Sequence, residues 1–322
     1  MTDRAVLSVD FELFTQTPAY RRAAGATDEE AVGLAAADYL LDVLAEHDAT
    51  ATFFVVSSVA ERHPDVVRRI AEAGHEVASH THTHRLLSTL DGDERTAEIE
   101  RSRAVLERVA GEPVSGFRAP AFDLPPGIFD DLEAAGYGYD SSVIPARAVP
   151  GWYGGEHDLH RPAPARRVRP GAPGGLAELP VSVMPGLRLP LSGAWLRFFG
   201  PRYTATGMRL LARRGVAPVL YLHPWELVDL PAVDGVPRRV YWRTGAWARR
   251  AVERLLAGPF EFVPARTVVA ESLESAGAAS TAVADEGRGA TAGEPRGSAA
   301  RATPGGRDPA DRNVHGASGG DG

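Results

Sequence analysis

Two short stretches organise this sequence: SHTHTH at residues 79–84 and SVDFE at residues 8–12. Histidines at positions i and i+4 lie on one face of a helical turn, so we expect His80 and His84 to reach the same ion. Residues 5–9, AVLSV, read as a β-strand, and side chains along a strand alternate between its two faces. Asp10 and Glu12 are therefore predicted to point to the same side.

These four side chains have the composition of a hydrolytic metal site. Two histidines and one carboxylate hold a divalent ion and leave a position open for water, and a second carboxylate can accept a proton from that water. A solvated histidine-rich turn is the alternative, and it is the better interpretation for a single pair of histidines. The rest of the chain decides between the two.

The composition permits a large core and argues against some classes of protein. At 322 residues, 44% of them hydrophobic, the chain can form one large domain or two small ones. The net charge of -7 gives no indication of nucleic-acid binding. The sequence contains no cysteine, which excludes disulfides and thiolate metal ligands.

The N-terminal residues carry no recognisable targeting signal. The mostly apolar run between Arg4 and Asp10 is too short for the core of a signal peptide. Apolar runs elsewhere fall short of the ~18–20 residues that a transmembrane helix needs. We therefore expect a cytoplasmic protein without a transmembrane segment.

Strand-like and helix-like segments alternate along most of the chain. The predicted strands are residues 5–9, 51–56, 76–79, 114–118, 137–141, 176–184, 218–222 and 260–263, and the predicted helices are residues 32–44, 63–74, 93–110, 126–135, 203–214 and 244–256. This alternation predicts parallel strands in a β/α barrel or a doubly wound sheet. In either architecture the chemistry lies at the carboxyl ends of the strands, where each motif falls.

Residues 150–175 are predicted to form a long loop over the mouth of the sheet. Trp152 and Tyr153 in this loop are candidates for stacking on a ring of the substrate or for core packing. The arginines of this loop either form a solvated basic surface or meet an anionic part of the substrate. They are Arg161, Arg166, Arg167 and Arg169. His157 and His160 lie in the same loop, and we do not expect a second metal site there.

The C-terminal residues differ from the rest of the chain. Residues 271–322 contain no aromatic residue and consist mainly of small residues, proline and charges. Such a segment cannot bury enough apolar surface to fold alone, so we predict a disordered tail. Residues 1–270 then form the catalytic domain.

Five motifs stand in an order that resembles the polysaccharide deacetylase family (the NodB homology domain, carbohydrate esterase family 4). They are Asp10-x-Glu12, His80-x-x-x-His84, Arg118-x-Pro120, the strand-end Asp140 and the apolar strand that ends in His223. The resemblance runs from about residue 5 to residue 268. The extension Pro224-Trp225-Glu226 is similar to the subgroup associated with exopolysaccharide synthesis. Singly the motifs are weak, and their order and spacing carry the resemblance.

The resemblance implies an α/β fold, a distorted (β/α)7-type barrel of the NodB kind, and a divalent metal site. By this resemblance Glu12, His80 and His84 bind the metal, with Zn²⁺ expected first and Co²⁺, Mn²⁺ or Ni²⁺ as alternatives. Asp10 is the catalytic base, and Arg118 keeps it ionised.

The same resemblance implies roles for residues on the far side of the site. His223 is the general acid, and Asp140 orients it and keeps it protonated; either Asp140 or Arg118 could instead belong to a structural ion pair. The backbone N–H of Ala121 is placed to stabilise an oxyanion, and Trp225 is a substrate contact. His82 is expected to point away from the metal ligands and to make a hydrogen bond or meet solvent.

The function implied is a metal-dependent hydrolase that removes N-acetyl groups from an N-acetylglucosamine-type sugar in a polysaccharide or glycan precursor. The carbohydrate partner could be lipid-linked. One alternative is a C–N hydrolase that acts on a small non-sugar amide or imide, with or without a metal. A second is a degenerate carbohydrate-binding protein, which the retained acid–base and ligand residues disfavour.

Overall fold

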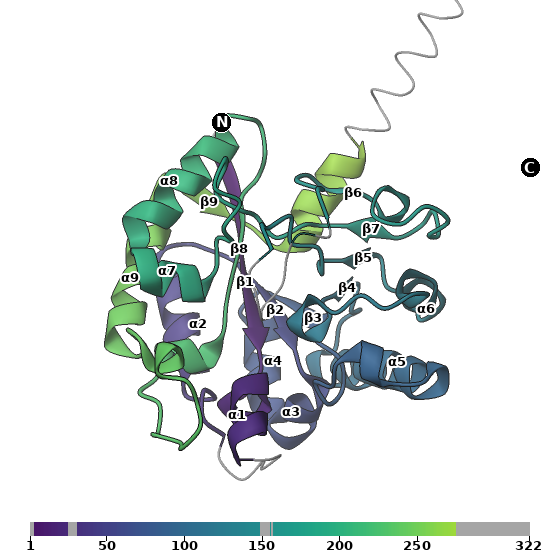
Figure 1. Ribbon diagram of the computed structural model, residues 1–322, viewed down its shortest axis with the longest axis horizontal. Helices are drawn as coiled ribbons and strands as arrows, with labels where there is room; N and C mark the ends of the chain where they lie inside the picture. The colour runs from purple at the N-terminus through teal and green to yellow at the C-terminus, as the bar shows by residue number, and fades with distance from the viewer. Residues whose placement is uncertain (1–2, 25–30, 149–154, 156, 275–322) are drawn as a thin grey trace, which may run out of the picture. The chain divides into compact units, whose positions relative to one another are not determined.

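A curled sheet of mainly parallel strands forms the centre of the protein, as seen in a computed structural model that describes residues 3–24, 31–148, 155 and 157–274 (Figure 1). The strands are β1 Asp3–Phe11, β2 Thr52–Val55, β3 Glu76–Ser79, β4 Gly116–Phe117, β5 Tyr139–Asp140, β6 Ala163–Pro164, β7 Ala177–Glu178, β8 Val219–Leu222 and β9 Phe260–Phe262. Their order is β6-β7-β5-β4-β3-β2-β1-β8, and β9 pairs with β1. The pairing of β6 with β7 is antiparallel.

Strand β1 is buried along almost its whole length because it pairs with β2 and β8 along its two edges. Its side chains alternate between two parts of the core. Leu7 and Val9 pack with the helices in the larger hydrophobic cluster, whereas Val6 packs inside the curl of the sheet. Asp10 shares the parity of Val6, so its carboxylate lies at the inner, carboxyl end of the strand.

The strand register brings the predicted motifs to one edge. Phe11 lies opposite Val55, and Val55 lies opposite Ser79. Ser79 pairs with Phe117, which in turn lies opposite Asp140. The residues that follow these strand ends therefore meet at one mouth, as expected for the carboxyl ends of parallel strands.

The chain after β7 closes the gap between β5 and β8. Val181 N–H donates to Val143 O at 2.9 Å, and Ser182 N–H donates to Val219 O at 2.9 Å. Ser192 then forms a parallel bridge with Tyr221 of β8. The sheet is thereby closed into a distorted barrel, which confirms the predicted fold class over the doubly wound alternative.

Helices surround the barrel: Figure 1 shows α2, α8 and α9 on one side and α5 and α6 on the other. The helices are α1 Pro18–Ala24, α2 Ala36–Glu46, α3 Ser57–Arg62, α4 Pro64–Glu72, α5 Gly92–Ala110, α6 Ile128–Ala134, α7 Gly193–Phe199, α8 Pro201–Ala212 and α9 Ala246–Leu256. Sequence patterning predicted most of them to within a few residues. It missed the short helices α1, α3 and α7.

The predicted C-terminal boundary needs a correction. Residues 265–274 are helical, and Val268 and Val269 pack inside the core, so a boundary at residue 270 falls within a helix. The remainder of the predicted tail, residues 275–322, lies outside the described residues. Within the described part of the chain, no helix combines the length and apolarity needed to cross a membrane.

Candidate functional site

The histidine loop does not form the helical turn that the i, i+4 spacing predicted. Thr81 and His84 have positive φ angles of 63° and 58°, so residues 80–84 form an irregular loop after β3. The Glu98 carboxylate holds this loop by accepting hydrogen bonds from the N–H groups of His82 (3.0 Å) and Thr83 (2.8 Å). The loop still brings the rings of His80 and His84 together, with centroids 4.9 Å apart.

Glu12, His80 and His84 form a buried cluster in which potential ligand atoms lie within 4.8 Å of one another. His80 Nδ1 lies 2.7 Å from Arg118 O, and His84 Nδ1 lies 3.1 Å from Gln16 O. Because a carbonyl oxygen can only accept, each Nδ1 carries a proton, and each Nε2 is the ring nitrogen left to face the cluster. This is the arrangement in which histidine binds metals.

The contact between Glu12 and His84 tests whether these residues fit a metal. Glu12 Oε2 lies 2.6 Å from His84 Nε2 but receives no well-formed hydrogen bond from the described residues. His84 Nδ1 already donates to Gln16 O, so Nε2 is the ring nitrogen that faces the carboxylate. A divalent cation would satisfy both atoms, and the one-carboxylate, two-imidazole donor set suits Zn²⁺. The residues therefore fit a bound metal.

The protonation states of the cluster agree with this interpretation. Burial alone would raise the pKa of Glu12, but the opposing effect of His84, followed by those of His223 and His80, holds this pKa well below its usual range. Burial lowers the pKa of His80 to about 4. Glu12 is thus ionised and His80 neutral near neutral pH, as metal binding requires.

Asp10 and Arg118 form a buried ion pair, with Arg118 Nη1 2.6 Å from Asp10 Oδ1. The guanidinium also donates to Ser8 Oγ and to the backbone and hydroxyl oxygens of Ser141 (each at 2.9 Å), and it lies over the ring of Phe54. These bonds fix Arg118 in one position. The predicted contact between the two residues is confirmed.

His223 is oriented by Glu226 rather than by Asp140, so the prediction for Asp140 is wrong. His223 Nδ1 lies 3.3 Å from Glu226 Oε2, and Arg197 Nε donates to the other oxygen of Glu226 at 2.9 Å. Burial alone would lower the pKa of His223, but the hydrogen bond to Glu226 and the charges of Glu12 and Glu226 raise it to about 9. The sequence patterns pointed to Glu226 only as part of the Pro224-Trp225-Glu226 extension, without a role, and gave no indication that Arg197 belongs to the site.

Asp140 instead pairs with Glu178, a buried carboxyl group that sequence reasoning missed. Asp140 Oδ1 accepts a hydrogen bond from Ser142 Oγ at 2.6 Å, and Glu178 Oε1 accepts one from Val143 N–H at 3.0 Å. Burial raises the pKa of both carboxyl groups, and the proximity of Asp140 raises that of Glu178 further. One proton shared between the two groups explains how both can be buried side by side.

A cavity of about 390 Å³ joins the acidic and histidine residues. Its lining includes Asp10, Glu12, His80, His84, His223, Ala121 and Trp225. Ala121 lies in an irregular turn with φ 52°. Trp225 is mostly buried and donates from Nε1 to Glu12 Oε1 at 3.1 Å, so it supports a candidate metal ligand as well as forming part of the wall.

Other predicted residues lie elsewhere. Trp152 and Tyr153 fall outside the described residues. His82 turns away from the cluster and its Nδ1 lies 2.8 Å from Ser57 Oγ, as expected. His160 lies near Asp158. The described residues contain one cluster of metal-binding type, and it is the one formed by Glu12, His80 and His84.

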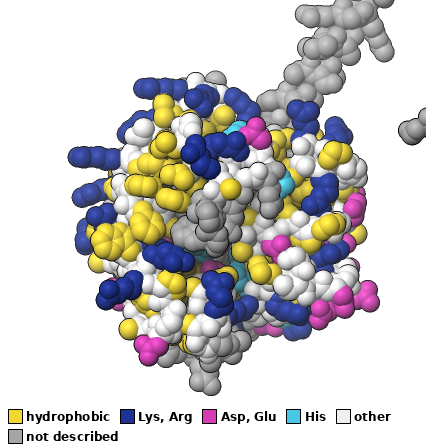
Figure 2. All heavy atoms as spheres, viewed as in Figure 1, with side chains coloured by type: hydrophobic (Ala, Val, Ile, Leu, Met, Phe, Trp, Pro, Cys, Tyr) yellow, Lys and Arg dark blue, Asp and Glu magenta, His cyan; other side chains and the backbone are white. Residues whose placement is uncertain are grey.

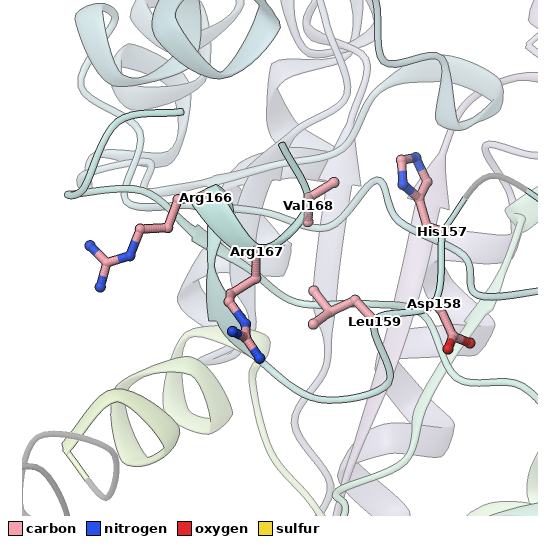
Figure 3. Close-up of a pocket in the computed structure, with 6 residues that line it drawn as sticks. All are labelled: His157, Asp158, Leu159, Arg166, Arg167 and Val168. Carbon is pink, nitrogen blue, oxygen red and sulfur yellow. The ribbon is translucent and has the colours of Figure 1, made fainter. Parts of the chain in front are cut away.

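The arginines of the loop at residues 150–175 do not line the catalytic cavity. Arg161 donates to Gly215 O, and Arg169 donates to Leu124 O and Pro125 O. Arg166 and Arg167 line a separate hollow together with His157 and its neighbours (Figure 3). The predicted contact of this loop with substrate therefore has no support in the cavity described above.

Comparison with known proteins agrees with this fold. Residues 30–139 match the polysaccharide deacetylase family model, and residues 141–270 match a domain of unknown function, DUF3473. A solved structure from Mycobacterium smegmatis that bears the polysaccharide deacetylase name superposes with a TM-score of 0.56 at 26% identity, over 85% of this chain and 92% of that one. The Puue allantoinase structure (TM-score 0.57, 18% identity, 83% and 88% of the two chains) shares the fold.

Named relatives match shorter segments. A peptidoglycan-N-acetylglucosamine deacetylase from Bacillus cereus is 38% identical over 87 residues, 27% of this chain and 30% of that protein. A chitooligosaccharide deacetylase from Rhizobium leguminosarum bv. trifolii is 46% identical over 67 residues, 21% of this chain and 31% of that protein. The matches thus span under a third of these two relatives.

The closed barrel and the convergent carboxylates and histidines define a deacetylase-type α/β barrel. The match of residues 30–139 to the polysaccharide deacetylase model confirms the resemblance of the motifs. Residues 141–270 carry DUF3473, a family associated with exopolysaccharide deacetylases.

Proposed function

We propose that this protein is a metal-dependent hydrolase that removes the acetyl group from an N-acetylglucosamine-type sugar in a polysaccharide or a glycan precursor. The observation that carries the proposal is the meeting of three potential metal ligands, Glu12, His80 and His84, with Asp10 and His223 around one cavity. An amide hydrolase needs this combination of a base, an acid and an electrophilic centre. The names of the relatives support the choice of an acetylated amino sugar.

Glu12, His80 and His84 would hold the divalent ion, and Zn²⁺ fits the donor set best. When bound, the ion polarises the amide carbonyl and makes a nearby water more acidic. Asp10 accepts the proton of the attacking water. Its ion pair with Arg118 holds the carboxylate at the wall of the cavity.

His223 donates a proton to the departing amine. It can do so near neutral pH because Glu226 and Glu12 hold it protonated. The backbone N–H of Ala121, on the cavity wall, is our candidate for contacting the oxyanion. The half of the cavity near Trp225 and Tyr221 offers aromatic surface to a sugar ring.

The test is acetate release from N-acetylglucosamine oligomers by the metal-loaded protein, with and without a chelator. We expect chelation to abolish release and added Zn²⁺ to restore it. Asp10→Asn should lower kcat by about 10²–10⁴-fold while metal content is retained. Undiminished release after complete metal removal would contradict the proposal and favour a metal-free amide hydrolase.

A matched pair of histidine variants separates metal binding from loop structure. His84→Gln should lose bound metal and activity together, whereas His82→Gln, two residues away but bonded to Ser57, should keep both. Metal content by elemental analysis and acetate release are the two measurements. Equal metal content in the two variants would show that the cluster is not the metal site.

A further inference from the structure

Four exposed, large hydrophobic side chains gather on one part of the surface next to the catalytic cavity. The described residues include six such side chains, and four of them form this group, which we call the aromatic surface: Leu187, Phe198, Phe199 and Trp242. Phe199 and Trp242 are 53% and 50% exposed. Figure 2 shows hydrophobic side chains gathered over α7 and α8 with basic side chains around them.

The aromatic surface is built on elements that are held to one another. The ring of Phe199 stacks on Trp195 (centroids 5.5 Å apart, 8° between planes) and contacts Tyr203 at 4.9 Å. Tyr203 Oη donates to Leu189 O, which ties the loop that carries Leu187 to α8. Arg197 Nη1 donates to Trp242 O at 2.6 Å, which ties Trp242 to α7. The four exposed side chains are therefore held in place by contacts between their supporting elements.

The charge around this surface is one-sided. Residues 179–225 contain six arginines and no aspartate, glutamate, asparagine or glutamine, although the whole chain has a net charge of -7. Of the six, Arg197 is buried against Glu226 and Arg188 pairs with Asp158, and the other four have no carboxylate in the same segment. Arg202 and Arg209 on α8 are exposed, and so is Arg243 beside Trp242. Exposed aromatic side chains fringed by arginines suit an anionic lipid surface, because the rings enter the interface while the cations meet the headgroups.

The same observations disfavour two other occupants. A second copy of this chain, related by a two-fold axis, would bring the arginines of both copies together. A neutral glycan is recognised through hydroxyl groups, and residues 179–225 offer no carboxylate or amide side chain to accept from them. An exposed apolar patch of this kind marks an interaction site rather than ordinary surface.

We propose that the aromatic surface docks this protein on an anionic membrane. Ala194 of α7 and Val240, at the other end of the surface, both line the catalytic cavity, so docking would place the mouth of the cavity close to the lipid headgroups. A glycan held by a lipid anchor would then be presented to the site. Docking itself requires neither catalysis nor a bound metal.

The test is sedimentation of the full-length protein with vesicles of phosphatidylglycerol and phosphatidylcholine, compared with vesicles of phosphatidylcholine alone. We expect binding to the anionic vesicles, weakened by salt, with a blue shift of tryptophan emission as Trp242 enters the interface. The double variant Phe198→Ser/Phe199→Ser should reduce the apparent affinity by about tenfold or more. Leu273→Ser, an exposed apolar residue on the C-terminal helix, is the matched control and should bind normally.

A charge-reversal pair tests the basic component separately. Arg202→Glu should weaken binding by at least about fivefold, since each basic residue near the surface contributes about 1 kcal/mol. Arg108→Glu on α5 should have little effect. Circular dichroism of each variant checks that the fold is kept.

Four outcomes would overturn the proposal. The wild-type protein could fail to bind anionic vesicles, or the Phe198→Ser/Phe199→Ser variant could bind them as well as wild type does. The same variant could instead lose affinity for soluble N-acetylglucosamine oligomers without affecting vesicle binding, which would identify a glycan platform. Light scattering that shows a wild-type dimer and a monomeric variant would identify a self-interface. Because none of these measurements uses turnover, they are independent of the proposed function.

Discussion

The indole Nε1–H of Trp225 donates a hydrogen bond to Glu12 Oε1 at 3.1 Å, joining residues at opposite ends of the barrel sequence. Glu12 follows β1, and Trp225 follows β8, the neighbouring strand. The bond occupies one carboxylate oxygen and leaves Oε2 directed at His84. It therefore directs Oε2 of Glu12 toward the other two potential metal ligands.

Trp225→Phe should weaken metal binding. The phenyl ring keeps most of the packing against His223 but loses the hydrogen bond that orients Glu12. Loss of such a supporting bond lowers metal affinity by about 10–100-fold. Competition with a chromophoric chelator measures the change, and Trp242→Phe is the control for removal of an indole. Equal affinities of wild type and Trp225→Phe would show that the bond has no orienting role.

Glu226→Gln should move the alkaline limb of the pH–rate profile to lower pH. His223 must be protonated to act as the acid, so activity is present below its pKa of about 9 and declines as the pH rises through that value. Removing the Glu226 charge lowers this pKa, and we expect a shift of about one unit or more. The measurement is kcat against pH, with the exposed Glu46→Gln as control.

The same variant should also be less stable, because Glu226→Gln leaves the guanidinium of Arg197 buried without its carboxylate partner. Breaking a buried pair costs about 3–5 kcal/mol, so unfolding by urea should be compared alongside the rates. A profile that keeps its alkaline limb in a folded variant would mean that Glu226 does not set the protonation of His223.

Gly193→Ala should displace Glu226. A Cβ at position 193 would lie inside van der Waals contact of Glu226 Oε2, so the carboxylate would have to move away from His223. We expect a loss of about 1–3 kcal/mol of stability together with a lower kcat. Gly92→Ala, at the first residue of α5 with open space around it, should be neutral or slightly stabilising. The measurements are thermal unfolding and acetate release. Equal results for the two glycine variants would contradict the prediction.

Glu178→Gln should flatten the dependence of stability on pH. The pKa values of Glu178 and Asp140 are raised in the folded state, so their contribution is fully present below the unfolded pKa and is lost as the pH rises. The amide of the variant can donate to Asp140 without a titrating proton. In urea unfolding, we therefore expect the free energy of unfolding of wild type to fall more between pH 5 and pH 8 than that of the variant. A parallel decline in both proteins would exclude the shared proton.

Sequence reasoning found the parts of the site that depend on short local patterns. Strand alternation placed Asp10 and Glu12 on one side, and parallel pairing brought His80 and His223 to the same mouth. The positive φ angles of Thr81 and His84 carry no such signal, because neither residue is a glycine. The helical turn was consequently wrong even though the convergence it predicted was right.

The partners of the site residues were the features that sequence patterns predicted least well. Asp140 was assigned to His223 by resemblance, but which of several buried carboxylates reaches a given imidazole depends on how the loop after β8 packs against α7. Glu226 lies only three residues from His223 and is part of η5 Pro224–Leu227, a short turn that the apolar pattern does not reveal. The barrel closure by residues 181–192 likewise rests on irregular hydrogen bonds with no periodic signature.

The boundary between the two family matches, at residue 140, divides the residues that line the catalytic cavity into two groups. Residues 1–139 hold Asp10, Glu12 and the histidine pair, of which the first two precede the matched range 30–139. The DUF3473 range contributes His223, Glu226 and the stretch that closes the barrel. Both ranges therefore line one cavity, and a swap of either between proteins would replace part of its wall.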